Sequence, residues 1–107
     1  MQFQINIGLD VPNKSVDHTA QQAKALALLQ ETFSHVQWRV AQSATEPTLV
    51  ASFTAAQSRV YAEALRISEA LEQDCVAVLN TQRNVGALVG PKAAEWGLFN
   101  KAYFIAL

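Results

Sequence analysis

The sequence predicts an α+β domain, a ferredoxin-like βαββαβ two-layer sandwich with an extra hairpin strand and a C-terminal aromatic extension. Residues 1–10 alternate between apolar and polar side chains, which is typical of a half-buried strand. The segments 15–33 and 54–71 repeat their apolar residues at helical spacing instead. No repeat or linker divides the chain, so we expect all 107 residues to form a single domain.

The first half of the chain predicts a strand, a helix and two more strands. Residues 10–15 form a loop, and Ser15 is expected to cap a helix that runs to about Phe33. A second alternating strand covers 36–40, and a third follows the polar turn 42–47 and covers 48–53. The predicted inner stripe of the helix is Ala23, Leu26, Leu29 and Phe33.

The second half begins with the strongest helical pattern in the chain. Thr54 followed by Gln57 matches a capping box, so the second helix is expected to begin there. Two strands, 75–79 and 85–89, are predicted to pair as a hairpin, and a short helical segment follows Gly90. The apolar segment 99–107 is predicted to form a sixth strand. The inner face of the second helix is Val60, Ala64, Ile67 and Leu71.

The charge balance argues against two classes of partner. Eight Lys and Arg residues face nine Asp and Glu residues, which gives a formal net charge of −1. A nucleic-acid binder or a peripheral membrane anchor normally carries a basic surface, so neither partner is expected. An export signal and an apolar run of spanning length are not recognisable either. The sequence therefore predicts a soluble, cytoplasmic protein.

The residue types that carry chemistry do not form a recognisable motif. Cys75 is the single cysteine and lies in an apolar run, which is typical of a small buried side chain. His18 and His35 have no ligands at metal-binding spacing. The glycines do not match a phosphate-binding loop. We therefore predict no catalytic residue, no metal and no cofactor, and a non-enzymatic protein is favoured.

Two surfaces are unusual and are predicted to contact protein. The outer face of the sheet is rich in uncharged amides, which a partner can cover without desolvating ions. Four of the nine aromatic residues fall within 96–104, and this segment must dock either within its own subunit or against a second one. The predicted interface residues are Gln2, Gln4, Asn6, Gln37, Arg39, Phe99, Tyr103 and Phe104.

We expect from these surfaces a small binding or regulatory module that acts through protein–protein contacts as a homodimer or larger homo-oligomer, with another protein as a further possible partner. The alternative is a binder of a small anionic molecule, or a minor enzyme, that uses the region 80–97. The candidate ligand-binding residues of this alternative are Arg83, Lys92, Glu95 and Trp96.

Overall fold

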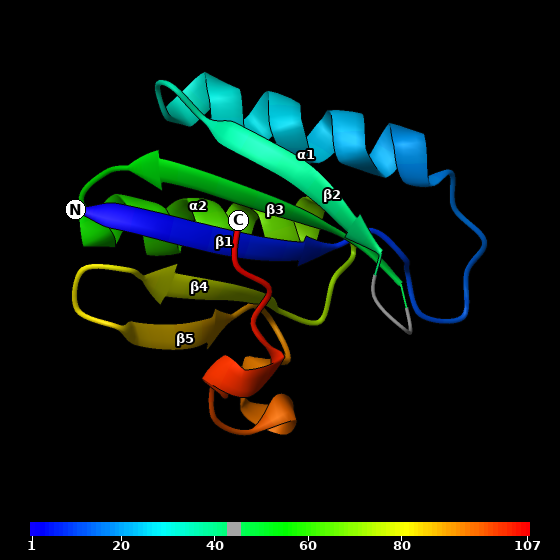
Figure 1. The fold of residues 1–107 in the computed structure, drawn as a ribbon. Helices are drawn as coiled ribbons and strands as arrows, with labels where there is room; N and C mark the ends of the chain where they lie inside the picture. Colours follow the sequence, from blue (N-terminus) through cyan, green and yellow to red (C-terminus); the bar gives the residue numbers. More distant parts are fainter. Residues whose placement is uncertain (43–45) are drawn as a thin grey trace.

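Five antiparallel strands form one sheet in the computed structural model, which describes residues 1–42 and 46–107 (Figure 1). The sheet order is β2-β3-β1-β4-β5. Two helices pack on one face of this sheet, so the predicted two-layer α+β architecture is confirmed for the described residues. The strands and helices, in chain order, are β1 (Gln2–Gly8), α1 (His18–Thr32), β2 (Gln37–Gln42), β3 (Pro47–Thr54), α2 (Gln57–Ala70), β4 (Val76–Asn80) and β5 (Val85–Val89).

The core lies between the helices and the apolar side of β1. Phe3 and Ile7 are fully buried there, because alternate residues of a strand point to the same side of the sheet. The inner face predicted for α2 is confirmed, since each of its residues is at most 1% exposed. Phe33 stacks on Phe53 with ring centroids 4.2 Å apart, which closes the core at the end of α1. The residues of this inner face are Val60, Ala64 and Ile67 of α2 and its C-cap Leu71.

The start predicted for the first helix is wrong, and so is one residue of its predicted inner stripe, whereas Leu26, Leu29 and Phe33 do face the core. The N-cap is Asp17 rather than Ser15, and its carboxylate accepts a hydrogen bond of 2.9 Å from the main-chain N–H of Thr19. Ala23, which was predicted to face inward, is exposed, and Ala25 is buried instead. Alanines occur on several sides of this helix, so its apolar pattern defines the inner face poorly.

The start predicted for the second helix is also wrong. Thr54 belongs to β3, where it pairs with Gln2 of β1, and this pairing keeps its backbone extended. The helix begins three residues later, and its N-cap is Ala56, without a capping side chain. Sheet pairing therefore overrides a local capping pattern at this junction.

The hairpin of β4 and β5 is confirmed, but the predicted sixth strand is wrong. Beyond β5 the chain forms two single-turn 3-10 helices, η1 (Ala93–Trp96) and η2 (Lys101–Tyr103). The segment 99–107, called the tail below, then crosses the sheet on the side away from α2, where Figure 1 shows the end of the chain over β1. Its main chain bonds to side chains of the sheet rather than to a strand edge.

None of the helices in the described part of the chain is long and apolar enough to cross a membrane.

Candidate functional site

The tail lies on the amide-rich face of the sheet and is held by side chains of β1 and β2. Asn6 Nδ2 donates to the carbonyl of Ile105 at 2.9 Å, and Asn6 Oδ1 accepts from the N–H of the same residue at 2.8 Å. Arg39 donates to the carbonyl of Ala106 at 2.5 Å, and Gln4 Oε1 accepts from the N–H of Leu107 at 3.2 Å. These side chains therefore bind an extended main chain.

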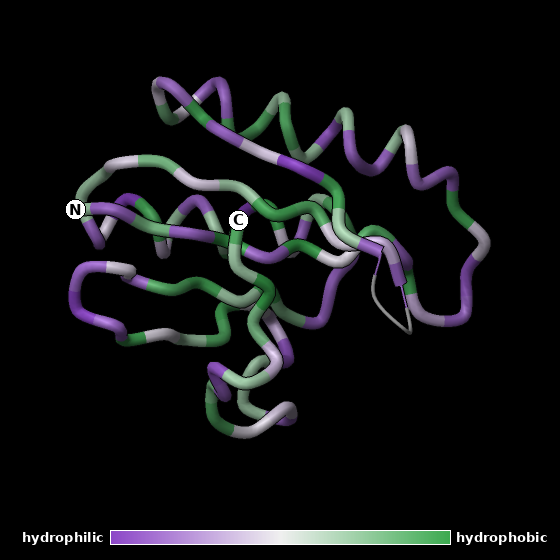
Figure 2. Tube along the Cα trace, viewed as in Figure 1, coloured by the Kyte–Doolittle hydropathy of each residue, from purple (hydrophilic) through white to green (hydrophobic). Residues whose placement is uncertain are grey.

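The other half of this face is apolar and receives the aromatic side chains of the tail. Pairing places Gly86 and Leu88 of β5 on the same side as Asn6, because they lie opposite Leu79 and Ala77 of β4. A Cβ at Gly86 would lie 2.3 Å from Phe99, so the absence of a side chain there lets the ring lie against the strand. Figure 2 shows hydrophobic residues on β4 and β5 and again at the end of the tail.

An apolar groove of about 450 Å³ lies between this half of the sheet and the tail. Three large side chains at the groove are uncovered: Leu98 is 94% exposed, Tyr103 84% and Trp96 63%. Phe99 and Phe104, whose ring centroids are 5.8 Å apart, form its inner wall. We call Leu88, Trp96, Leu98 and Tyr103 the apolar patch.

The structure separates the predicted interface residues into three groups. Gln4, Asn6 and Arg39 hold the tail, so the middle of the amide-rich face is covered by the protein's own chain rather than open. Gln2 donates to Ser52 Oγ at 2.5 Å and lies with Gln37 at a separate small cleft near His35. The predicted aromatic residues of the tail, Phe99, Tyr103 and Phe104, all line the apolar groove.

The four predicted ligand-binding residues do not converge on one pocket. Arg83 lies in the turn between β4 and β5, whereas Lys92 and Glu95 follow the opposite end of β5. A five-residue strand spans about 17 Å, which is too far for one small ligand to contact both ends. Of the four residues, Trp96 lines the apolar groove and also a larger cleft.

This larger cleft, of about 710 Å³, lies where β1 ends and where β3 and β4 begin. Its carboxyl groups are Asp10, Glu46 and Asp74, against the single amine of Lys14. Burial raises the pKa of Glu46 above 4.5, although a hydrogen bond from the Asp10 main chain opposes the shift. The cleft is therefore acidic and does not suit the anionic ligand predicted from the sequence.

Cys75 also lines this cleft, and its surroundings keep it protonated. Partial burial raises the pKa of its thiol above 9.0, and the adjacent carboxylate of Asp74 raises it further. A nucleophilic cysteine needs the opposite shift, which positive neighbours produce. The prediction that Cys75 is not a nucleophile is supported by this environment, although the side chain is only partly buried.

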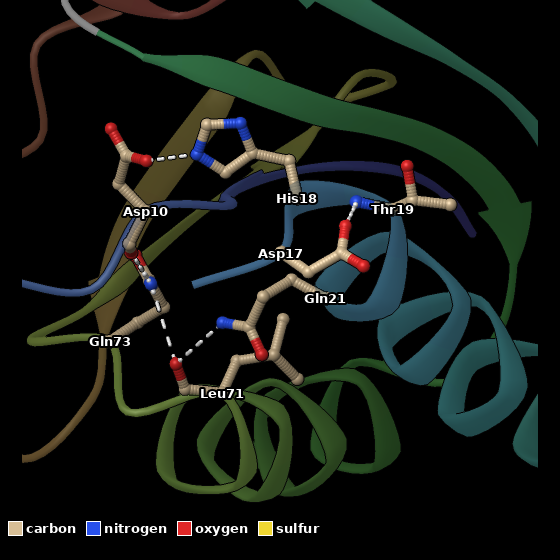
Figure 3. A network of polar contacts seen from close by, with 7 residues as sticks. All are labelled: Asp10, Asp17, His18, Thr19, Gln21, Leu71 and Gln73. Carbon is tan, nitrogen blue, oxygen red and sulfur yellow. Dashed lines mark hydrogen bonds and ion pairs between the residues drawn. The ribbon is translucent and has the colours of Figure 1, made fainter. Parts of the chain in front are cut away.

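Close to the cleft, a polar network ties the start of α1 to the end of α2 and to the loop after β1 (Figure 3). His18 contacts the carboxylate of Asp10, and Gln73 donates to the Asp10 main-chain carbonyl. The carbonyl of Leu71, which ends α2, accepts from Gln21 at 3.1 Å and from Gln73 at 3.5 Å. The network satisfies polar groups at the helix end and fixes the wall of the cleft.

Sequence reasoning missed both the acidic cleft and the binding partners of the amides. Asp10 follows β1, Glu46 precedes β3 and Asp74 precedes β4, and these three positions meet at one edge of an antiparallel sheet. Acidic residues at adjoining strand ends were therefore an available signal. In contrast, the bond between Asn6 and Ile105 joins residues 99 positions apart and leaves no local pattern.

Within residues 1–42 and 46–107, no three His, Cys, Asp or Glu side chains are grouped so that they could hold a metal ion. Comparison of the chain with protein-family models, curated proteins and solved structures finds no match.

Proposed function

We propose that this protein is a small, non-enzymatic binding or regulatory module that acts through protein–protein contacts as a homodimer or larger homo-oligomer. The observation that carries the proposal is the apolar patch, where Leu98, Tyr103 and Trp96 are 94%, 84% and 63% exposed. They lie at a groove that is itself lined mostly by apolar side chains. A cluster of exposed apolar side chains is found at protein interaction sites more often than on the rest of a protein surface.

A partner would bury apolar side chains that are exposed in the single subunit. The side chain of Leu98 makes almost no contacts within the subunit, since it is nearly fully exposed. Burying one such side chain in an interface is worth about 1.5–3 kcal/mol, and aromatic anchors such as Trp96 and Tyr103 contribute most at interface centres. The described residues that line the groove are all uncharged, although Trp96 also borders the acidic cleft.

A pair of matched variants tests the proposal by sedimentation velocity. Leu98→Lys places a charge in the apolar patch and is expected to convert the oligomer to monomer. Leu65→Lys changes an exposed leucine on α2, which is 41% exposed, and is expected to leave the oligomer intact. A wild-type protein that sediments as a monomer at every concentration contradicts the proposal, as does equal loss of assembly in both variants.

The proposal also covers the type of fold and the cellular location of the protein. We propose a ferredoxin-like sandwich, supported by the order β2-β3-β1-β4 of four strands, to which β5 adds a fifth. A cytoplasmic protein without nucleic-acid or membrane partners is proposed from the net charge of −1 and from a single cysteine that has no partner in the chain.

A small-molecule binder is the second candidate, and the 710 Å³ cleft favours it. Because Asp10, Glu46 and Asp74 line the cleft, a cationic ligand that stacks on Trp96 fits it better than an anion. Thermal unfolding in the presence of spermidine or inorganic phosphate tests this alternative. Stabilisation by spermidine that Asp74→Asn and Trp96→Ala each abolish supports it, and no shift with either compound contradicts it.

A further inference from the structure

We propose that two copies of this chain exchange tails, so that residues 99–107 of one copy lie on the sheet face of the other. This inference rests on the proposed self-association and names the segment that makes the contact. Exchange preserves the hydrogen bonds between the tail and the sheet face, because each tail forms the same bonds with the sheet of the other copy.

The sheet face recognises the tail largely through its main chain. Asn6 binds both the N–H and the carbonyl of Ile105, while Arg39 binds the carbonyl of Ala106 and Gln4 the N–H of Leu107. These four bonds join residues that are 67 to 103 positions apart in the sequence. Their geometry therefore does not depend on whether the tail belongs to the same copy or to a second one.

The connection between η1 and the tail has the properties of a hinge. Gly97 has a φ of +84°, and nothing lies within 4 Å of the position where its Cβ would be. Leu98, the next residue, is 94% exposed. Few contacts are therefore lost if these two residues change their backbone angles and direct the tail away from its own sheet.

Exchange also adds contacts that a single subunit does not make. In a two-fold arrangement the two hinges pass beside each other, which covers Leu98 of both copies.

Paramagnetic broadening between full-length chains tests the exchange. In a Cys75→Ser background, one chain carries Ala106→Cys with a nitroxide label, and the other chain is ¹⁵N-labelled without a nitroxide. The two chains are mixed, unfolded in urea, refolded together and concentrated until light scattering gives the dimer mass. We expect loss of the Asn6 and Arg39 amide signals of the ¹⁵N chain. A nitroxide at Ala102, which is also exposed, provides a second probe.

Each outcome is decisive. Broadening in the mixed dimer supports exchange, and dilution to the monomer mass should restore the signals. A dimer in which broadening occurs only when the nitroxide and ¹⁵N are in the same chain overturns the exchange but leaves self-association in place. A monomer mass throughout the concentration range overturns both proposals.

Discussion

The side chain of Asn6 binds both main-chain groups of Ile105, with bonds of 2.9 Å from Nδ2 to the carbonyl and 2.8 Å from the N–H to Oδ1. An asparagine amide carries a donor and an acceptor side by side, so it can pair with an extended residue as a neighbouring strand would. Asn6 is 9% exposed, so its amide would lack partners if the tail moved away without a replacement. The tail is therefore part of the folded domain.

Asn6→Ala is expected to weaken tail docking and to lower the free energy of unfolding by about 1–3 kcal/mol. The variant removes two hydrogen bonds and leaves the main chain of Ile105 unpaired in a partly buried place. Urea denaturation measures the loss. Gln30→Ala, which truncates an exposed amide on α1, serves as the control and should change stability little. Equal effects of the two substitutions would show that the bonds to Ile105 contribute nothing.

Gly86→Ala is expected to displace Phe99, because the new methyl group would lie 2.3 Å from the ring. The cost should be about 1–3 kcal/mol, as for other overpacked contacts. Combining it with Phe99→Ala should cost less than the sum of the two single changes, since the truncated side chain leaves room for the methyl group. Gly86→Ala combined with Leu65→Ala, at an exposed position of α2, should be additive. Additivity in both double variants would refute the contact.

Ile67→Ala tests the core beneath α2. Ile67 is 0% exposed, and its truncation is expected to lower the free energy of unfolding by about 2–5 kcal/mol. Leu65→Ala removes a similar side chain from the same helix. Because Leu65 is 41% exposed, this substitution should lower the free energy of unfolding by well under about 2 kcal/mol. Denaturant melts of both variants give the comparison, and similar losses would mean that the helix is rotated relative to the sheet.

The raised pKa of Glu46 predicts that the contribution of this residue to stability falls as the pH rises above 4.5. Burial makes the folded protein hold this proton to a higher pH than the unfolded chain does, so the folded state binds more protons across that window. Glu46→Gln removes the titration. We therefore expect the free energy of unfolding of Glu46→Gln, minus that of the wild type, to be larger at about pH 7 than at a pH below 4.5. A difference independent of pH would contradict the assignment.

Glu72 should show the opposite dependence. A hydrogen bond from Lys14, 2.9 Å long, lowers the pKa of this exposed carboxylate below 4.5. The unfolded chain then binds more protons in the window below 4.5, so this contribution to stability is present above the window and is lost as the pH falls through it. Glu72→Gln should be less stable than wild type at neutral pH and equal to it in strong acid. Urea titrations at both pH values measure the sign.

The sheet and the second helix could be predicted because their patterns are local. Alternation along β1 and helical spacing from Val60 to Leu71 both reflect one buried face, and that face decides the structure. The helix starts were mispredicted where tertiary contacts compete with capping, as at Thr54, whose backbone pairs with Gln2. In α1, the alanine-rich pattern led to Ala23 instead of Ala25 in the predicted inner stripe.

The candidate sites were harder to predict because they depend on contacts between distant residues. The composition of the tail indicated that it must dock, but apolar residues alone did not distinguish a strand from a segment that crosses the sheet. That choice depends on Asn6 and Arg39, which bind main-chain groups about a hundred and about seventy residues away. Likewise, Arg83 and Lys92 are close in sequence, but β5 separates them.

Amide hydrogen exchange at Ile105, followed residue by residue by NMR, tests most directly whether the tail is seated on the sheet face. We expect the Ile105 N–H to be protected in the wild-type protein and Asn6→Ala to abolish this protection, while amides of β1 stay protected. If Ile105 of the wild-type protein instead exchanges at the rate of an unstructured peptide while β1 stays protected, the tail is not seated on the sheet.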